Sequence, residues 1–138
     1  MAPEALASRV VAGILAWCCL LAGCSRREPE ITVTWTLDPQ RPTVDAEIIV
    51  RLELVNADGT PVNGARLQCD AQMSHPGMAP IAGAVVERGQ GVYETRLRLT
   101  MPGDWVLVAS GELADGRRVA GSKRIPSVQP AKPPVPGP

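Results

Sequence analysis

Three methionines and one histidine are the residues of this chain whose types and spacing could do chemistry. Two of the methionines bracket the only histidine, in Met73-Ser74-His75-Pro76-Gly77-Met78, and the third is Met101. Thioether sulfur and imidazole nitrogen together suit Cu(I), a soft cation, whereas the scarcity of carboxylates here disfavours calcium or magnesium. Met73, His75, Met78 and Met101 are therefore candidate ligands of Cu(I), and the cofactor we expect is copper.

The candidate ligands lie where strands of the expected sheets end. Residues 65–73 and 92–101 both alternate apolar and polar side chains at the period of a β-strand. If each strand reverses the chain, the loop after Met73 and the turn after Met101 lie at the same end of the domain. Both methionines share the inward phase of their strands, so their side chains are expected at that rim. Trp105 follows the turn and could shield a bound cation or stack on it.

Each of these residues also has a structural explanation. Methionine at a strand end commonly fills an irregular edge of a core, and a lone histidine before Pro-Gly is commonly a solvated loop residue. Cys69 has the phase of Met73, which indicates a buried small apolar residue, with a role as a ligand as the alternative. No serine or cysteine nucleophile stands in a recognisable motif, and there is no phosphate-binding loop or dinucleotide fingerprint, so we expect no enzyme.

The first 23 residues are typical of a cleaved export signal. Arg9 precedes an apolar run over residues 10–21, which is too short to span a bilayer. The run ends in Leu21-Ala22-Gly23-Cys24, which resembles the lipobox of bacterial lipoproteins. The resemblance implies a signal peptide over residues 1–23, lipid on Cys24, and a lipidated tether over residues 24–30 that holds the protein on a membrane. A plain signal peptide followed by a chance cysteine is the alternative.

The location expected from this signal is the cell envelope. Ser25 is not the aspartate that, by the same resemblance, retains lipoproteins at the inner membrane. The expected site is the periplasmic face of the outer membrane in a Gram-negative host, and the outer face of the cell membrane otherwise. Loss of the signal and lipidation leave Cys69 as the last thiol, so no internal disulfide is possible. Fourteen acidic and fourteen basic residues give no electrostatic reason to expect a nucleic-acid partner.

Alternating apolar residues separated by turn signals predict an all-β fold over residues 31–128. The turn signals include Asp58-Gly59, Pro102-Gly103 and Asp115-Gly116. Seven strands at this spacing are typical of an antiparallel immunoglobulin-like sandwich. We expect a disordered proline-rich tail over residues 129–138. The expected strands cover residues 31–37, 47–56, 65–73, 82–87, 92–101, 105–113 and 117–125.

Four short motifs in fixed order resemble the YtkA-like and FixH-like domains. They are Gly59-Thr60-Pro61-Val62-Asn63-Gly64-Ala65, Met73-x-His75-x-x-Met78, Gly91-Val92-Tyr93 and Met101-Pro102-Gly103-Asp104-Trp105. The resemblance implies a small extracytoplasmic β-sandwich linked to copper handling or to assembly of copper-containing oxidases. FixH proteins have a membrane-spanning helix, whereas this chain has a lipidation motif, which favours the YtkA-like branch.

Two functions of different class follow from these observations. The first is a lipid-anchored domain that binds Cu(I) and exchanges it with a copper donor or acceptor protein. The alternative is a metal-free immunoglobulin-like module that binds a partner by its loops or by strand addition. A third hypothesis is a structural tether in an envelope complex, with residues 129–138 as the contact.

Overall fold

Eight strands and no helix make up the part of the chain described by this computed structural model, residues 30–134. Between those bounds there is no helix with the length and apolar character needed to cross a membrane. The expected signal peptide, the lipidation site Cys24 and most of the tether lie outside the described residues. The strands are β1 Thr32–Asp38, β2 Glu47–Val55, β3 Arg66–Met73, β4 Ile81–Gly83, β5 Val85–Gly89, β6 Val92–Arg98, β7 Gly103–Glu112 and β8 Arg118–Val128.

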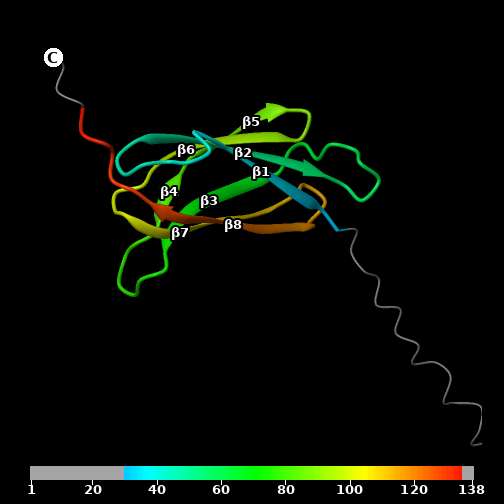
Figure 1. Cartoon of the computed structure of the whole chain (residues 1–138). Helices are drawn as coiled ribbons and strands as arrows, with labels where there is room; N and C mark the ends of the chain where they lie inside the picture. Colours follow the sequence, from blue (N-terminus) through cyan, green and yellow to red (C-terminus); the bar gives the residue numbers. More distant parts are fainter. Residues whose placement is uncertain (1–29, 135–138) are drawn as a thin grey trace, which may run out of the picture.

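The strands form two four-stranded antiparallel sheets, in the orders β1-β2-β6-β5 and β4-β3-β7-β8. Figure 1 shows the two sheets as two layers, one above the other. Alternation explains the layers, since every second side chain of a strand points to the same face. The apolar sets of both sheets meet in shared clusters, in which Ile48 and Val50 of one sheet join Leu107 and Ile125 of the other. The all-β prediction is confirmed.

The strand count differs from the prediction because the expected strand 82–87 is divided between the sheets. β4 pairs with β3, and β5 pairs with β6, so the chain crosses from one sheet to the other at Ala84. The crossing brings Gly83 close to β6, where an added Cβ would meet the hydroxyl of Thr95 and lie 2.7 Å from Leu97 Cδ2. Glycine is required there because the two sheets approach closely. The result is eight strands rather than seven.

The sequence predicted that Met101 would be the last residue of a strand. In the structure, Met101 lies in the turn between β6 and β7. β6 ends at Arg98, whose partner Glu47 is the first residue of β2. Before Glu47, the backbone at Asp45 has φ 64° and no longer runs alongside β6. The last hydrogen bond between the two segments is donated by Asp45 N–H to Leu99 O, at 2.8 Å. Residues after Leu99 therefore have no neighbouring strand to pair with. Alternation of side chains continues into this turn, but pairing does not.

The loop between β2 and β3 is fixed to β6 by two side chains. The hydroxyl of Tyr93 donates to Val62 O at 2.8 Å and accepts from Ala65 N–H at 3.1 Å. Asn63 Oδ1 accepts from Gly91 N–H at 2.8 Å. These contacts join two of the motifs quoted above, Gly59–Ala65 and Gly91–Tyr93. Both motifs therefore serve the fold, at the end of the domain where β1 begins.

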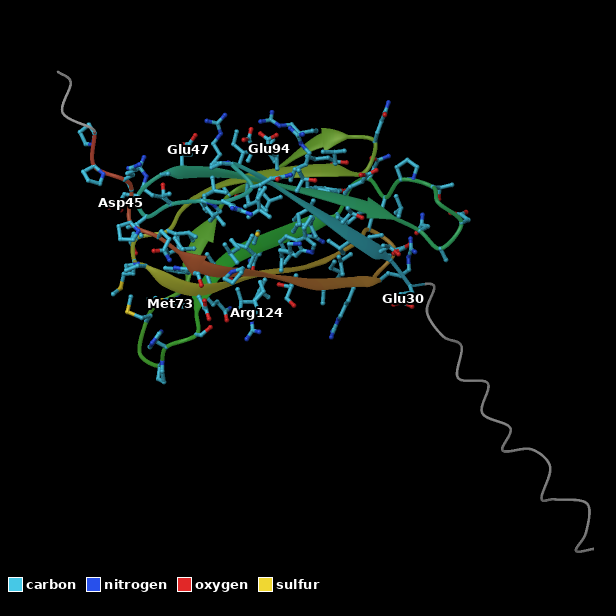
Figure 2. The ribbon with its side chains drawn as sticks, in the orientation of Figure 1. Glu30, Asp45, Glu47, Met73, Glu94 and Arg124 are labelled. Atoms are coloured by element: carbon cyan, nitrogen blue, oxygen red, sulfur yellow. The ribbon has the colours of Figure 1, made fainter. Side chains whose placement is uncertain are left out.

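The described chain enters the domain at the end opposite to Met73. Thr32 at the start of β1 pairs with Val55 at the end of β2, while Asp38 pairs with Ile49 near the other end. Figure 2 shows Glu30 and Met73 at opposite ends of the molecule. At the exit, Gln129 O accepts a 2.9 Å hydrogen bond from Val44 N–H, and residues 130–134 continue without regular structure.

Candidate metal centre

Met73 and Trp105 face one another across the ladder between β3 and β7. The side chain of Met73 is partly buried and packs against the core cluster that contains Trp105. Its terminal Cε would lie 3.0 Å from a Cβ added at Gly103, the first residue of β7. The absence of a side chain at Gly103 therefore makes room for the thioether of Met73 at the rim of the sheet.

Trp105 also fixes Met101. The indole Nε1 donates a 3.0 Å hydrogen bond to the carbonyl oxygen of Met101, four residues earlier in the turn. The indole itself is only 1% exposed, so it lies inside the core beneath the turn. Trp105 is thus a buried support of both methionines rather than an aromatic face open to solvent. We refer to this end of the domain, with Met73, Met101 and the loop of residues 74–80, as the methionine end.

Two of the candidate ligands are exposed although their side chains are apolar. Met78 is 42% exposed and Met101 is 41% exposed. Among the described residues, the other large apolar side chain with comparable exposure is Val86, at 49%. A methionine that merely fills a gap in a core would be buried, as Met73 partly is. Met78 and Met101 instead expose a large part of their side chains to solvent.

His75 lies in the loop between β3 and β4, which Figure 1 shows projecting beyond the lower sheet. Its side chain is exposed. The loop is attached at its start, where Ser74 N–H donates to Asp104 O at 3.3 Å. Gly77 allows the tight turn after Pro76, because its φ of 91° is in the region that favours glycine. His75 and Met78 therefore lie on a loop that leaves the end of β3 and is hydrogen-bonded to Asp104 near the start of β7.

The four predicted ligands therefore share one end of the domain, on three neighbouring segments. Between Glu30 and Pro134, no three His, Cys, Asp or Glu side chains form a group that could hold a metal ion. A centre of three thioethers and one imidazole contains only one residue of these four kinds. Thioethers do not titrate, so their affinity for a soft cation depends little on pH.

Cys69 is outside this centre. Its side chain is fully buried, and its neighbours across the strands are Ala109 and Gly83. Burial raises the pKa of the Cys69 thiol to about 11, and the nearby Asp70 carboxylate adds to the rise. The thiol is therefore protonated at neutral pH and packs as a small apolar residue, as the sequence predicted.

Asp104 is a residue of this region that the sequence reasoning missed. Its carbonyl accepts from Ser74 N–H, and its Oδ1 accepts from Ser127 N–H at 2.8 Å. It thereby joins the loop of His75 to the end of β8. The motif Met101-Pro102-Gly103-Asp104-Trp105 contained the residue, but only the folded chain shows which segments it connects.

The fold and the methionine end together define a small all-β domain of two packed antiparallel sheets. Residues 29–109 match the family model described as YtkA-like. That match covers more than half of the chain, from β1 into β7, and the chain belongs to the YtkA-like family. A comparison with curated proteins finds no match.

Two solved structures share the fold at low sequence identity. A DUF4426 family protein from Pseudomonas aeruginosa PAO1 is 14% identical, with a TM-score of 0.55 over 78% of this chain and 97% of that one. The filamin domain of Lin-41 is 13% identical, with a TM-score of 0.51 over 71% of this chain and 94% of that one. At such identities the likeness concerns the fold alone.

Proposed function

We propose that this protein is a lipid-anchored extracytoplasmic domain that binds Cu(I) through Met73, His75, Met78 and Met101. Its role would be copper handling or assembly of copper enzymes, without a catalysed reaction. Family membership supports an extracytoplasmic β-domain. The lipid on Cys24 and the resulting place in the envelope rest on the lipobox.

One observation carries the copper proposal. The buried Trp105 is paired with Met73 and hydrogen-bonded to the backbone of Met101, so two methionines far apart in sequence are supported by one side chain. Met78 and His75 lie on the loop of residues 74–80, which is hydrogen-bonded to Asp104 on β7, the strand of Trp105. Exposed thioethers gathered on a fixed support can take a soft cation without burying charge in the core.

The metal-free interaction module is the second candidate. Exposed methionine side chains also suit adaptable protein contacts, because the unbranched thioether adjusts to many surfaces. This candidate predicts that replacing the methionines by leucine preserves partner binding, whereas the copper proposal predicts loss of metal binding.

The test is an anaerobic titration of the protein with Cu(I) under reducing conditions, followed by calorimetry. We expect saturable binding with one ion per chain that persists in mild acid. Met78→Leu should weaken it at least about tenfold, equivalent to about 1.4 kcal/mol. Val86→Leu, which also alters an exposed apolar side chain, is the matched control and should leave the affinity unchanged. Absence of saturable binding, or equal affinity of Met78→Leu and wild type, would refute the proposed ligand set.

A further inference from the structure

A groove of about 530 Å³ runs beside the methionine end, between the β1–β2 loop and β8. One wall is formed by residues 40–43 and the other by residues 123–127. Val44 N–H donates to Gln129 O, and this bond joins the two walls beyond Thr43. The groove is therefore bounded by two segments that are far apart in sequence but held together at one end.

The lining of the groove is cationic above an apolar base. Three cationic residues line it, Arg41, Lys123 and Arg124, and all three are exposed. Arg124 has the outward phase of β8, so the cationic side chains above the apolar base are those of Arg41 and Lys123. Buried apolar side chains of Leu37 and Ile125 contribute beneath them. The lining contains no carboxylate, and within residues 30–134 none of the three cations forms an ion pair. Outside the lining, Asp104 Oδ1 accepts from Ser127 N–H, and Asp38 follows Leu37 in sequence.

The backbone of this wall is unsuited to pairing with an added strand. Lys123 occupies the inward phase of β8, between Gly121 and Ile125, yet its side chain is exposed. Pro126 lacks an N–H, and Ser127 has φ 52°. A charge in the inward phase, a proline and an irregular backbone are the features by which edge strands avoid pairing with other chains. Recognition in the groove must therefore come from its side chains.

We propose that this groove docks an acidic segment of the protein that exchanges copper with this domain. Carboxylates interspersed with apolar side chains match the cationic side chains of Arg41 and Lys123 and the apolar base, and such complementarity steers association. A single small oxyanion would occupy only a small part of the volume. The proposal rests on the proposed function, since it places the partner beside the copper centre.

The groove and the methionine end are directly connected. Ile125 pairs with Trp105 on β7, and Trp105 in turn pairs with Met73 on β3. Asp104 bonds both Ser127 in the groove wall and Ser74 in the loop of His75. A docked segment would therefore hold its protein next to the candidate ligands, at the end away from the start of β1.

The test measures binding of a fluorescent peptide of glutamates interspersed with leucines, by anisotropy, to the protein expressed from its full sequence without copper. Arg41→Glu with Lys123→Glu, one residue from each wall, should weaken binding at least about tenfold, equivalent to about 1.4 kcal/mol. The matched control is Arg66→Glu with Arg118→Glu, which changes the net charge equally but away from the groove, beside Glu112. It should change affinity less than about twofold. If the charge reversals unfold the protein, Arg41→Gln with Lys123→Gln replaces them.

Several outcomes would overturn the proposal. Equal losses in the two double variants would show unspecific attraction to positive charge. Binding of inorganic phosphate or glycerol 3-phosphate that displaces the peptide, with no preference for leucine over glutamine in it, would show a small-anion or headgroup site. The variant Met73→Leu/Met78→Leu/Met101→Leu separates this proposal from the copper proposal, because it should retain peptide binding whether or not wild type binds Cu(I).

Discussion

The hydroxyl of Tyr93 donates a 2.8 Å hydrogen bond to the carbonyl oxygen of Val62, 31 residues earlier, and the contact is buried. The same hydroxyl accepts from Ala65 N–H. Tyr93→Phe leaves both backbone groups without this partner, so we expect the free energy of unfolding to fall by about 1–3 kcal/mol in urea titrations. Arg51→Gln, which breaks an exposed ion pair with Glu94, should have a much smaller effect. Equal midpoints for Tyr93→Phe and wild type would contradict the assigned role.

The raised pKa of the buried Cys69 thiol predicts that the protein loses stability in alkaline solution. Its pKa is raised to about 11, so the folded state retains a proton that the unfolded chain releases at its ordinary pKa. The stabilisation is fully present below about pH 9 and declines as pH rises toward about 11, by about 2–3 kcal/mol in all. Cys69→Ala should remove this decline in urea titrations across the range. The raised pKa of Tyr93, caused first by burial, gives a further decline above about pH 10 that both proteins share. A decline of equal size in Cys69→Ala and wild type would assign it to other groups.

The buried hydroxyl of Thr95 predicts that a substitution at this position stabilises the protein. The residue is 2% exposed, and its Oγ1 has no hydrogen-bond partner among the described residues. Thr95→Val keeps the shape and removes the unsatisfied hydroxyl, so we expect the free energy of unfolding to rise by about 1 kcal/mol. Thr36→Val on the exposed face of β1 serves as the control and should stay within about 0.5 kcal/mol. A lower thermal midpoint for Thr95→Val would indicate that the hydroxyl has a partner in solution.

The contacts of Trp105 with both methionines predict that its substitution lowers both stability and copper affinity. Trp105→Phe removes the hydrogen bond to Met101 O and part of the packing beneath Met73, so we expect a loss of about 1–3 kcal/mol in unfolding. If the copper proposal holds, Cu(I) affinity should fall as well, although the indole is no ligand. Trp35→Phe is the control, because Trp35 packs against the core but stands on β1. Retained Cu(I) affinity in Trp105→Phe would show that the methionines do not depend on this support.

The strands were predictable because alternation of side chains is a local signal. Residues 47–55 and 66–73, for example, bury every second side chain as expected. The crossing at Ala84 was not predictable, since both halves of the segment look like one strand and only the close approach of Gly83 to β6 divides them. Alternation likewise continues into the turn of Met101, where no partner strand exists.

The candidate site was predictable as a location but not in its details. Reversal of direction at each strand brings Met73 and Met101 to one end, and this holds even with the extra strand. The burial of Trp105 could not be predicted, because a tryptophan after a turn can lie on either face of the sheet. The connections made by Asp104 and the groove beside β8 depend on pairings between segments far apart in sequence.

The position of β1 has a mechanical consequence. β1 enters at the end opposite to Met73 and pairs with β2 over its whole length, from Thr32 with Val55 to Asp38 with Ile49. A pull between the chain before Glu30 and a partner held at the methionine end acts along the strands. The hydrogen bonds between β1 and β2 then carry the load together, in shear, and cannot open one after another from an end. Stretching the domain between the start of β1 and the methionine end would therefore have to break these hydrogen bonds together.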